Sequence, residues 1–570
     1  MKRLTYQTLA LITLMFIFGC KDDSEKPIYE YTKTAISNSA MVVSAHPEAT
    51  RVGLEILAKG GNAVEAAIAV QFALAVTYPV AGNIGGGGFM VIRMNDGQSY
   101  ALDFREKAPL AAFRDMYLDE NGDADPKLSR HGHLASGVPG VVDGMVKAYE
   151  KFGGKVSWEA ILNPSIQLAE GFKLTHRQAR NLNNKKKEFE LYNTIANALA
   201  PTVPFKGGQV LVQKDLRNTM QLIKTKGRAG FYEGEVANKI VAEMERGGGI
   251  ISLQDLKKYR AQWRTPIQST YREYGLISMP PPSSGGIALS QLLSSIEKFP
   301  MQEYDFQDLN AIHIMTEAER RVYADRATHL GDSDFYPVPI EALINKDYVN
   351  ERMSNFNIKE ASLSDSIAAG IIPPKESEET THFSIVDKDG NAVAVTTTIN
   401  GGYGSKVVVG NAGFLLNNEM DDLSAKPGVP NMFGLIGNEA NAIAPEKRML
   451  SSMTPTIVTK DNNLFMVVGT PGGSTIITSV FQVISNVIDH GMSLSEAVAA
   501  KRFHHQWKPD AIFVEDATFD STKIKALEAM GHTVTGRGNI GRVDAIQVRS
   551  DGKLEGAADP RGDDHAAGFD

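Results

Sequence analysis

Two threonines, Thr380 and Thr398, are the first candidates for chemistry because a predicted hairpin brings their hydroxyl groups face to face. The loop 388–390 ends in glycine, and a three-residue loop with a left-handed glycine at its end is a common hairpin turn. Pairing the strands 382–386 and 391–398 around this loop places Thr398 directly opposite Thr380. A hydroxyl becomes a nucleophile once a base activates it. The alternative is a threonine–threonine cross-strand pair, which sheets use widely.

The segment in front of this hairpin has the composition of a flexible connector. Residues 364–379 contain a Pro-Pro pair followed by the charged run 375–379, and they offer little apolar surface to bury. A strand pattern begins directly after them. An acidic segment that ends abruptly at a strand is an unusual boundary for a compact domain, and Thr380 stands at that boundary.

Several elements on both sides must position these threonines. A helix is predicted over 47–59, with proline in its first turn and a Gly-Gly stop after it. A second helix, 63–76, begins with a capping box and is apolar nearly all round, so we expect it to be buried. Residues 140–350 are expected to be mostly helical. Later, an extended segment at 464–468 precedes a helix at 474–489.

A glycine-rich stretch, 82–88, leads into a strand pattern at 89–92. Glycine-rich loops can bind phosphate, but here no Lys-Ser/Thr follows the glycines and no helix begins there, so a P-loop is excluded. We instead expect close backbone packing beside a site.

The first twenty residues are typical of an export signal. Lys2 and Arg3 precede a hydrophobic run, 9–18, which is shorter than the roughly twenty residues that span a bilayer. The run ends in Ile-Phe-Gly-Cys, which resembles the lipobox of bacterial lipoproteins, with cleavage before Cys20 and a lipid on its sulfur. Cys20 is the single cysteine of the chain. The alternative is an ordinary signal peptide followed by a chance cysteine.

These features predict an exported protein that is held by lipid at the bacterial cell envelope, on the periplasmic face or the outer membrane. Several acyl chains on one cysteine make a durable anchor. Residues 1–19 would be the signal peptide and 20–40 a tether. No later segment reaches a transmembrane length without charges.

Composition excludes several classes of protein. The chain has 570 residues, of which 42% are hydrophobic and 22% charged, values near the globular average. A disordered, collagen-like or coiled-coil protein is therefore excluded as the main interpretation. With a net charge of −8, the chain has no global basic field for nucleic acid. One cysteine excludes a disulfide framework and a thiolate metal cluster within the chain.

A set of motifs resembles those of the gamma-glutamyltranspeptidase family. The motifs are 379–387 at the hairpin, 103–109, 415–422, 450–455 and 469–474. They occur in the family's order with compatible spacing, and the resemblance runs from about residue 41 to the C-terminus. No single motif decides the matter, but the set is highly specific.

The resemblance implies an N-terminal-nucleophile hydrolase of the α+β class, an αββα sandwich formed by two chains cut from one precursor. Cleavage would fall between Glu379 and Thr380, giving a large subunit, 41–379, and a small catalytic subunit, 380–570. The freed Thr380 would be the nucleophile. Its own α-amine, with a reference pKa of about 7.7–8.0, would be the base, so cleavage would create that base.

The same resemblance implies the remaining catalytic groups. Thr398 would orient Thr380. Gly472 and Gly473 would bind the oxyanion through backbone N–H groups at the N-terminus of a helix that Ser474 is expected to cap. The alternative for the two glycines is a simple tight turn.

A γ-glutamyl group carries an α-carboxylate and an α-ammonium, and the resemblance implies residues for both. Arg105 would bind the carboxylate bidentately, although an arginine between Asp103 and Glu106 is more often part of a surface ion pair. Hydroxyl groups for the carboxylate would come from Ser451 and Ser452. The ammonium would be held by Asp422, together with Glu419 and Asn400.

Residues 427–437 resemble the lid loop of bacterial members of the family. Phe433 stands where such relatives often have tyrosine, so the phenol that could latch the lid to Asn400 is missing. Lid tightness is therefore expected to differ.

The implied protein is an autoprocessed gamma-glutamyltransferase and glutathione hydrolase. It would form a γ-glutamyl ester on Thr380 from glutathione or another γ-glutamyl compound, and pass it to water, an amino acid or a peptide. No cofactor or metal is expected, and adjacent histidines such as His504 and His505 point to opposite faces of a strand. Two alternatives remain: a related amidohydrolase of the cephalosporin-acylase type, and a lipid-anchored binding protein without catalysis.

Overall fold

The structure is a computed structural model that describes residues 26–367, 380–432 and 434–570. The predicted signal peptide, Cys20, Glu379 and Phe433 lie outside these ranges, so the interpretations that rest on them stay predictions.

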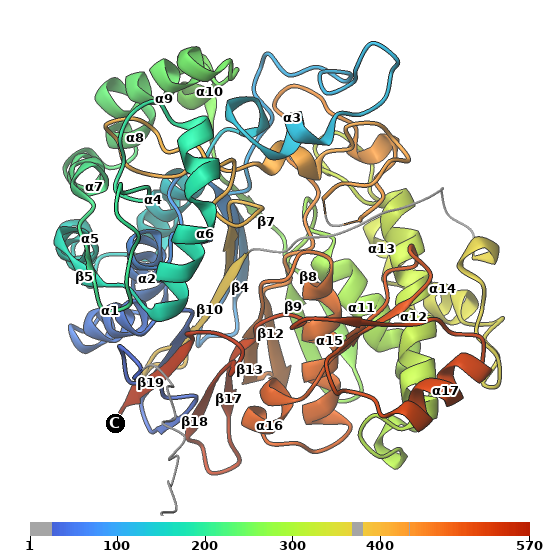
Figure 1. Cartoon of the computed structure of the whole chain (residues 1–570). Coiled ribbons are helices and arrows are strands. Elements are labelled where there is room, and N and C mark those ends of the chain that lie inside the picture. Colours follow the sequence, from blue (N-terminus) through green and yellow to red (C-terminus); the bar gives the residue numbers. More distant parts are fainter. Residues whose placement is uncertain (1–25, 368–379, 433) are drawn as a thin grey trace, which may run out of the picture.

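Two seven-stranded antiparallel sheets lie face to face at the centre of the molecule, and helices cover the outer face of each (Figure 1). The first sheet consists, in spatial order, of β19 (His565–Phe569), β2 (Ala40–Ser44), β10 (Thr381–Val386), β11 (Ala392–Thr398), β3 (Gly87–Arg93), β4 (Ser99–Asp103) and β7 (Gln262–Arg264). The second consists of β1 (Thr34–Ser37), β18 (Leu554–Ala558), β17 (Asp544–Val548), β13 (Asn463–Gly469), β12 (Thr456–Lys460), β9 (Tyr274–Ser278) and β8 (Ile267–Tyr271). The predicted αββα sandwich is confirmed.

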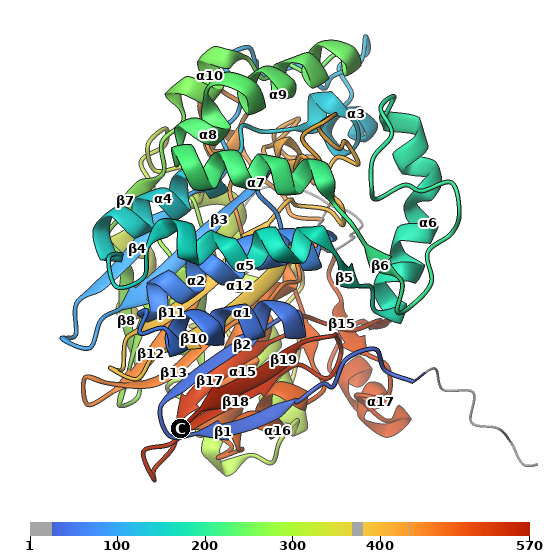
Figure 2. The same cartoon turned by 90° about the vertical axis from the view of Figure 1, so that its left-hand side faces the viewer.

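The core has three parts that follow these layers. Apolar side chains such as Val43, Phe89 and Ile457 fill the space between the sheets. The first sheet is covered by α1 (Pro47–Ala58), α2 (Ala63–Thr77), α4 (Val141–Phe152), α5 (Trp158–Glu170), α7 (Lys214–Lys226), α8 (Ala229–Tyr232) and α9 (Gly234–Gly247), several of which face the viewer in Figure 2. The second is covered by α11 (Gly285–Ile296), α12 (Leu309–His329), α15 (Thr475–Ile488), α16 (Leu494–Ala499) and α17 (Ser521–Ala529).

The remaining helices and two small sheets lie around these layers. The further helices are α3 (Pro126–Arg130), α6 (His176–Tyr192), α10 (Leu253–Lys258), α13 (Ile340–Leu343) and α14 (Lys346–Arg352), with 3-10 turns η1 (His133–Ala135), η2 (Met301–Glu303), η3 (Ser364–Ser366), η4 (Glu419–Asp422) and η5 (Glu439–Asn441). The small sheets are β5 (Phe172–Lys173) with β6 (Val210–Leu211), and β14 (Phe503–His504) with β15 (Ile512–Glu515) and β16 (Val534–Arg537).

The two helices predicted near the N-terminus are confirmed. In α1, Pro47 occupies the first turn, and His46 caps the helix by accepting a hydrogen bond from the Glu48 amide. Helix α2 begins with a reciprocal capping box between Asn62 and Glu65. All of its residues are buried, as an apolar surface on every side requires.

The expectation for residues 140–350 was incomplete. Helices dominate there, but β7, β8 and β9 also lie in this region, and β8 and β9 form a hairpin at the edge of the second sheet. Strand β8 alternates between buried and exposed residues, which is the period-two pattern of a half-exposed strand.

The hairpin that carries Thr380 and Thr398 has the predicted register. Strands β10 and β11 pair with Thr381 opposite Thr397, so that the next pair outward is Thr380 and Thr398. Gly390 has φ of +83° and its amide donates to the Asp387 carbonyl at 3.0 Å, as the predicted turn requires. Both strands lie in the middle of the first sheet, where neighbours fix them on both sides.

The glycine-rich stretch 82–88 packs against the backbone beside this hairpin, as predicted. A Cβ on Gly85 would lie 2.1 Å from the Leu415 carbonyl oxygen, and a Cβ on Gly86 would lie 2.2 Å from the Thr398 carbonyl oxygen. Only glycine allows the chain to approach Thr398 so closely.

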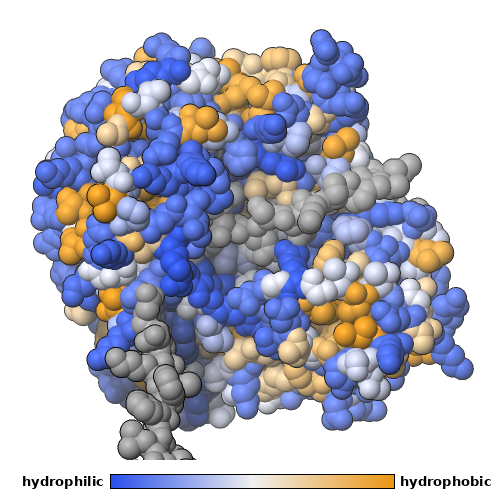
Figure 3. Space-filling model, viewed as in Figure 1, coloured by the Kyte–Doolittle hydropathy of each residue, from blue (hydrophilic) through white to orange (hydrophobic). Residues whose placement is uncertain are grey.

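Within the described ranges no helix is both long and apolar enough to cross a bilayer. The face of the molecule shown in Figure 3 is largely hydrophilic, with hydrophobic residues in scattered patches.

Candidate active site

The two threonine hydroxyls meet in the interior of the molecule. Thr380 and Thr398 are 4% and 3% exposed, and their Oγ1 atoms are 3.5 Å apart. The Asn400 amide donates a hydrogen bond of 2.7 Å to the Thr398 hydroxyl oxygen. Asn400 has φ of +68°, an uncommon conformation that turns its backbone toward Thr398. The Thr398 hydroxyl can therefore donate its own hydrogen toward Thr380.

A buried histidine, His382, fixes two other hydroxyl groups of the same hairpin. His382 shares a strand face with Thr380, because residues two apart along a strand point the same way. Its Nδ1 lies 2.9 Å from the Thr396 hydroxyl and its Nε2 lies 3.0 Å from the Ser384 hydroxyl. Burial lowers the pKa of His382 to about 3, so the ring is neutral and holds both hydroxyls in fixed positions.

Gly472 and Gly473 precede helix α15, as expected for an oxyanion site. Their φ angles of +141° and +53° lie in the region that favours glycine. The predicted cap by Ser474 is wrong. Ser474 already has helical backbone angles, and its side chain makes no capping hydrogen bond within the described part of the chain. The Thr475 hydroxyl and amide instead donate to the Gly472 carbonyl at 2.8 and 2.9 Å.

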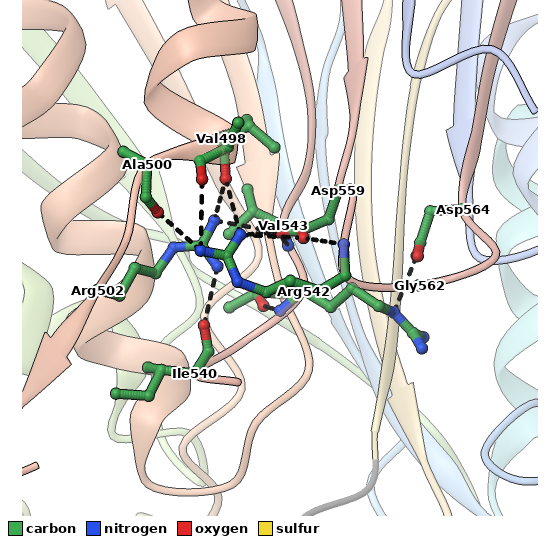
Figure 4. Close-up of polar contacts among 12 residues, drawn as sticks. Val498, Ala500, Arg502, Ile540, Arg542, Val543, Asp559, Gly562 and Asp564 are labelled. Carbon is green, nitrogen blue, oxygen red and sulfur yellow. Dashed lines mark hydrogen bonds and ion pairs between the residues drawn. The ribbon is translucent and has the colours of Figure 1, made fainter. Parts of the chain in front are cut away.

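A cluster of buried ion pairs supports this glycine segment. The Arg542 amide donates to the Thr470 hydroxyl at 2.7 Å, two residues before Gly472. The Arg542 side chain pairs with Asp564 at 2.9 Å, and the neighbouring Arg502 pairs with Asp559 at 3.0 Å (Figure 4). These pairs tie the last strands of the chain to the segment that carries the glycines.

A cavity beside Thr380 brings together most of the residues that the sequence assigned to the reaction. Its walls include Arg105, Thr380, Thr398, Asn400, Glu419, Asp422, Ser451, Ser452 and Gly473. Gly472 precedes Gly473 directly but is not among the lining residues.

Arg105 lies at the centre of a group of buried carboxyls, so the alternative of a surface ion pair is wrong. The side chain is 1% exposed. Its Nη1 lies 2.7 Å from Glu419 and 3.5 Å from Glu106, and its Nη2 lies 2.6 Å from Asp422. The groups implied to bind the two ends of an amino acid therefore pair with each other in this structure.

The carboxyls around Arg105 hold their protons more strongly than ordinary carboxyls. Burial raises the pKa of Asp422 to about 6 and that of Glu106 to about 8, and Arg105 partly offsets both effects. Burial also raises the pKa of Glu419. For Arg105, burial acts against the charge, but the pairs with Glu419, Glu106 and Asp422 prevail and raise its pKa. Arg105 thus stays charged.

The cavity wall contains a second buried cation, Arg326, which was not predicted from the sequence. Arg326 is 3% exposed and lies on α12. Its Nη2 donates to the Ser452 hydroxyl at 3.1 Å and its Nε to the Ser284 hydroxyl at 2.9 Å. Among the described residues no carboxylate forms an ion pair with it, and burial lowers its pKa to about 10. A buried guanidinium without a carboxylate partner is suited to bind an anion.

One signal in the sequence could have identified Arg326. On a helix, acids three or four residues away are the natural partners of an arginine. Positions 322, 323, 329 and 330 hold no acid. An arginine without such partners on an otherwise buried helix indicates a partner outside the helix.

The loop 427–437, which was predicted to be a lid, is attached to the site without the missing tyrosine. The Asn431 side-chain amide donates to Asp422 at 2.9 Å, and the Met432 amide donates to Asp421 at 2.7 Å. The Asn431 amide and the Leu435 carbonyl close the turn at 3.1 Å, and Leu435 lines the cavity. These contacts hold the loop against the cavity wall.

The two adjacent histidines bind different partners. His504 Nδ1 lies 2.8 Å from the Thr478 hydroxyl, and His505 Nε2 lies 3.3 Å from Asp510. This agrees with their interpretation as structural residues.

Comparison with known proteins identifies the family. The gamma-glutamyltranspeptidase family model matches residues 49–569. The glutathione hydrolase proenzyme of Escherichia coli (strain K12) is 47% identical over 97% of this chain and 94% of its own length.

Two solved structures are similar as well. Helicobacter pylori gamma-glutamyltranspeptidase is 42% identical, with a TM-score of 0.56, over 60% of this chain and 97% of its own. A cephalosporin acylase from Bacillus halodurans shares the fold, with a TM-score of 0.83 over 96% of this chain and 99% of its own, at 24% identity.

Proposed function

We infer that this chain, which belongs to the gamma-glutamyltranspeptidase family, is an autoprocessed gamma-glutamyltransferase and glutathione hydrolase. The observation that supports a role for its own residues is one cavity in which the Thr380 hydroxyl, Gly473 and the cations Arg105 and Arg326 meet.

The precursor is proposed to cleave itself between Glu379 and Thr380. The Thr380 hydroxyl attacks the Glu379 carbonyl, and the C–N bond breaks as the ester forms, which frees the α-amine of Thr380. Water then hydrolyses the ester and releases the Thr380 hydroxyl and the carboxylate of Glu379. That amine has a reference pKa of about 7.7–8.0, so a useful fraction is neutral near pH 7 and can accept the proton of the hydroxyl.

The donor is held by its amino-acid end. Its α-carboxylate binds Arg105 and the hydroxyls of Ser451 and Ser452. Arg326 orients the Ser452 hydroxyl by donating a hydrogen bond to its oxygen. Its α-ammonium binds Asp422, where it replaces part of the present contact with Arg105. Glu419 lies on the other nitrogen of Arg105 and keeps that guanidinium in place.

Asn400 completes the ammonium site. Its side-chain amide nitrogen donates to the Asn418 carbonyl at 3.0 Å, which leaves its amide oxygen as the acceptor. The same residue fixes the hydroxyl of Thr398 through its backbone, so substrate binding and nucleophile orientation share one residue.

Acyl transfer then proceeds in two steps. The Thr380 oxygen attacks the γ-carbonyl while its proton passes to the α-amine, and the N–H groups of Gly472 and Gly473 stabilise the oxyanion. The ammonium returns the proton to the leaving amine, and a γ-glutamyl ester remains on Thr380. Water or the amine of an amino acid or peptide loses a proton to the same base and takes the glutamyl group, and the α-ammonium returns that proton to the departing Thr380 oxygen.

Arg105 and Asp422 together should favour a γ-glutamyl donor over the glutaryl amide that a cephalosporin-type acylase would take. A glutaryl amide has the same carbon chain and carboxylate as a γ-glutamyl amide but no ammonium group. When a glutaryl amide is bound, Asp422 would have no substrate ammonium group to pair with. We therefore propose that γ-glutamyl amides are preferred over glutaryl amides by roughly tenfold or more, the value of one charge-assisted hydrogen bond.

The cellular location is a separate proposal. The Ile-Phe-Gly-Cys sequence at the end of the hydrophobic run supports export, cleavage before Cys20 and attachment of lipid to its sulfur. The lipid would hold the protein at the cell envelope.

Trapping the ester tests the assignment of the nucleophile. The purified protein is mixed with γ-glutamyl-p-nitroanilide, quenched in acid within the first turnover, and digested for mass spectrometry. We expect one glutamyl group on the peptide that begins with Thr380. Thr381→Val is the matched control, because Thr381 offers a neighbouring buried hydroxyl. Loss of the adduct in this control, with Thr380 intact, would move the nucleophile to Thr381.

A further inference from the structure

A second group of side chains with metal-binding chemistry lies away from the cavity. His313, Glu317 and His532 are buried, and each offers a donor atom such that all three atoms lie within 4.8 Å of one another. His313 and Glu317 are four residues apart on α12, so they share one face of that helix. His532 follows α17, on the other side of the proposed cleavage point.

The hydrogen bonds of the two histidines fix where their protons lie. His313 Nε2 is 2.8 Å from the Asn357 carbonyl oxygen, which can only accept, so this nitrogen carries the proton. His313 Nδ1 therefore presents a lone pair. His532 Nε2 lies 2.7 Å from it and must be the donor. This leaves His532 Nδ1 with a lone pair and, among the described residues, no hydrogen-bond partner, although His532 is only 5% exposed.

Glu317 is a fixed and charged carboxylate. Arg321 Nη1 lies 2.6 Å and Arg320 Nε 3.1 Å from its oxygens, and the Ser362 amide donates to it at 3.1 Å. Burial acts against the charge, but these contacts prevail and lower the pKa of Glu317 to about 2. Outer contacts of this kind orient ligand carboxylates, as the Asn357 carbonyl orients His313.

We propose that His313 Nδ1, His532 Nε2 and a Glu317 oxygen bind a divalent metal ion of the zinc type. Two nitrogens, one oxygen and a water make a tetrahedral set that zinc accepts. Zinc–nitrogen bonds of about 2.0–2.1 Å place two ligand nitrogens roughly 3.3 Å apart, so the histidines must separate by about 0.6 Å. The proton of His532 moves from Nε2 to its unpartnered Nδ1, and no proton is released.

Two arginines beside Glu317 limit the affinity of this site for a metal ion. Arg320 and Arg321 both contact Glu317, and their positive charges raise the electrostatic cost of a further cation. Binding is therefore weaker than at a structural zinc site that has no arginine nearby. Metal concentrations in the micromolar range and above are the relevant ones.

The site has a structural role. His313 and Arg326 are 13 positions apart on α12, which is about 20 Å along a helix at ~1.5 Å per residue. The metal is therefore remote from Thr380. It joins α12 to the segment after α17, and after the proposed cleavage these belong to different chains. This last point rests on the proposed function, whereas the site itself does not.

Metal content and cobalt absorption test the site directly. The purified two-chain protein, without a histidine tag, is stripped with EDTA and dialysed to equilibrium against an excess of Zn²⁺ or Co²⁺, and the metal in the protein compartment is compared with that in the dialysate. The variant is His532→Gln, and the control is His490→Gln, which removes a half-buried histidine elsewhere. We expect about one zinc per protein, and visible Co²⁺ bands of a tetrahedral site, in the wild type and the control only.

Thermal unfolding adds a second readout. At zinc a hundredfold above its Kd, a chain of this size should gain roughly 2 °C in Tm. His532→Gln should lose the gain and keep γ-glutamyl-anilide turnover, since His532 does not touch the cavity. Wild-type protein without stoichiometric metal, or with the same metal content as folded His532→Gln, would show that the two histidines only share a hydrogen bond. Loss of the site with normal turnover leaves the proposed function intact.

Discussion

Replacing Arg105 by lysine should weaken donor binding and leave self-cleavage intact. The guanidinium pairs through two nitrogens, with Glu419 at 2.7 Å and Asp422 at 2.6 Å. Lysine keeps the charge but cannot present the planar fork that binds a carboxylate through two bonds. Loss of one charge-assisted hydrogen bond costs about 1.5–3 kcal/mol. Because every ~1.36 kcal/mol is tenfold, kcat/KM should fall roughly 10- to 100-fold, mainly through KM.

Arg105→Met should lower kcat/KM further than Arg105→Lys does, because Arg105 also controls the charge of Asp422. Arg105 is the nearby charge that most lowers the pKa of Asp422. Without it, the pKa of Asp422 rises further and the group is protonated at neutral pH. The methionine variant thus loses the ammonium partner together with the carboxylate partner, and the two losses multiply.

The assay is release of p-nitroaniline from γ-glutamyl-p-nitroanilide, beside a denaturing gel of the same preparation. Self-cleavage uses a peptide bond and needs no amino-acid substrate, so both variants should still give two chains. Arg105→Met with kcat/KM within threefold of wild type would refute the role of Arg105. Equal losses in the two variants would refute the link between Arg105 and Asp422.

Arg326, Asp422 and Cys20 each give one further expected outcome. Arg326→Met should lower kcat/KM roughly tenfold without blocking cleavage, because it removes the charged donor to Ser452, and Arg326→Lys should recover part of the loss. As the pH falls through about 6, Asp422 takes up a proton, so kcat/KM for γ-glutamyl-p-nitroanilide should fall, while that for glutaryl-p-nitroanilide should not show this limb. Cys20→Ser should move the protein to the soluble fraction with unchanged activity, and a variant that still sediments with membranes would mean another attachment.

The sequence predicted the parts of the site that depend on local patterns. The hairpin register followed from its loop length, because turn type fixes which residues face each other. Close backbone packing at Gly85 and Gly86 was expected because the glycine-rich stretch lacks the residues of a P-loop. Burial of the second helix followed from its apolar surface. In each case the deciding information lies within a few neighbouring residues.

Features set by distant contacts could not be predicted in this way. Arg105 pairs with Glu419 and Asp422, which lie far along the chain, so nothing near Arg105 distinguishes it from a surface residue. Arg326 donates to Ser284 and Ser452, again from other elements. The cap of α15 was misassigned because a serine before a helix is normally the better capping residue.

The most direct test of the account is N-terminal sequencing and intact mass of the purified, active protein. The account predicts two chains, of which the smaller begins at Thr380 with Thr-Thr-His-Phe-Ser. A single uncut chain with full activity, or a small chain that begins at any residue other than Thr380, would contradict it.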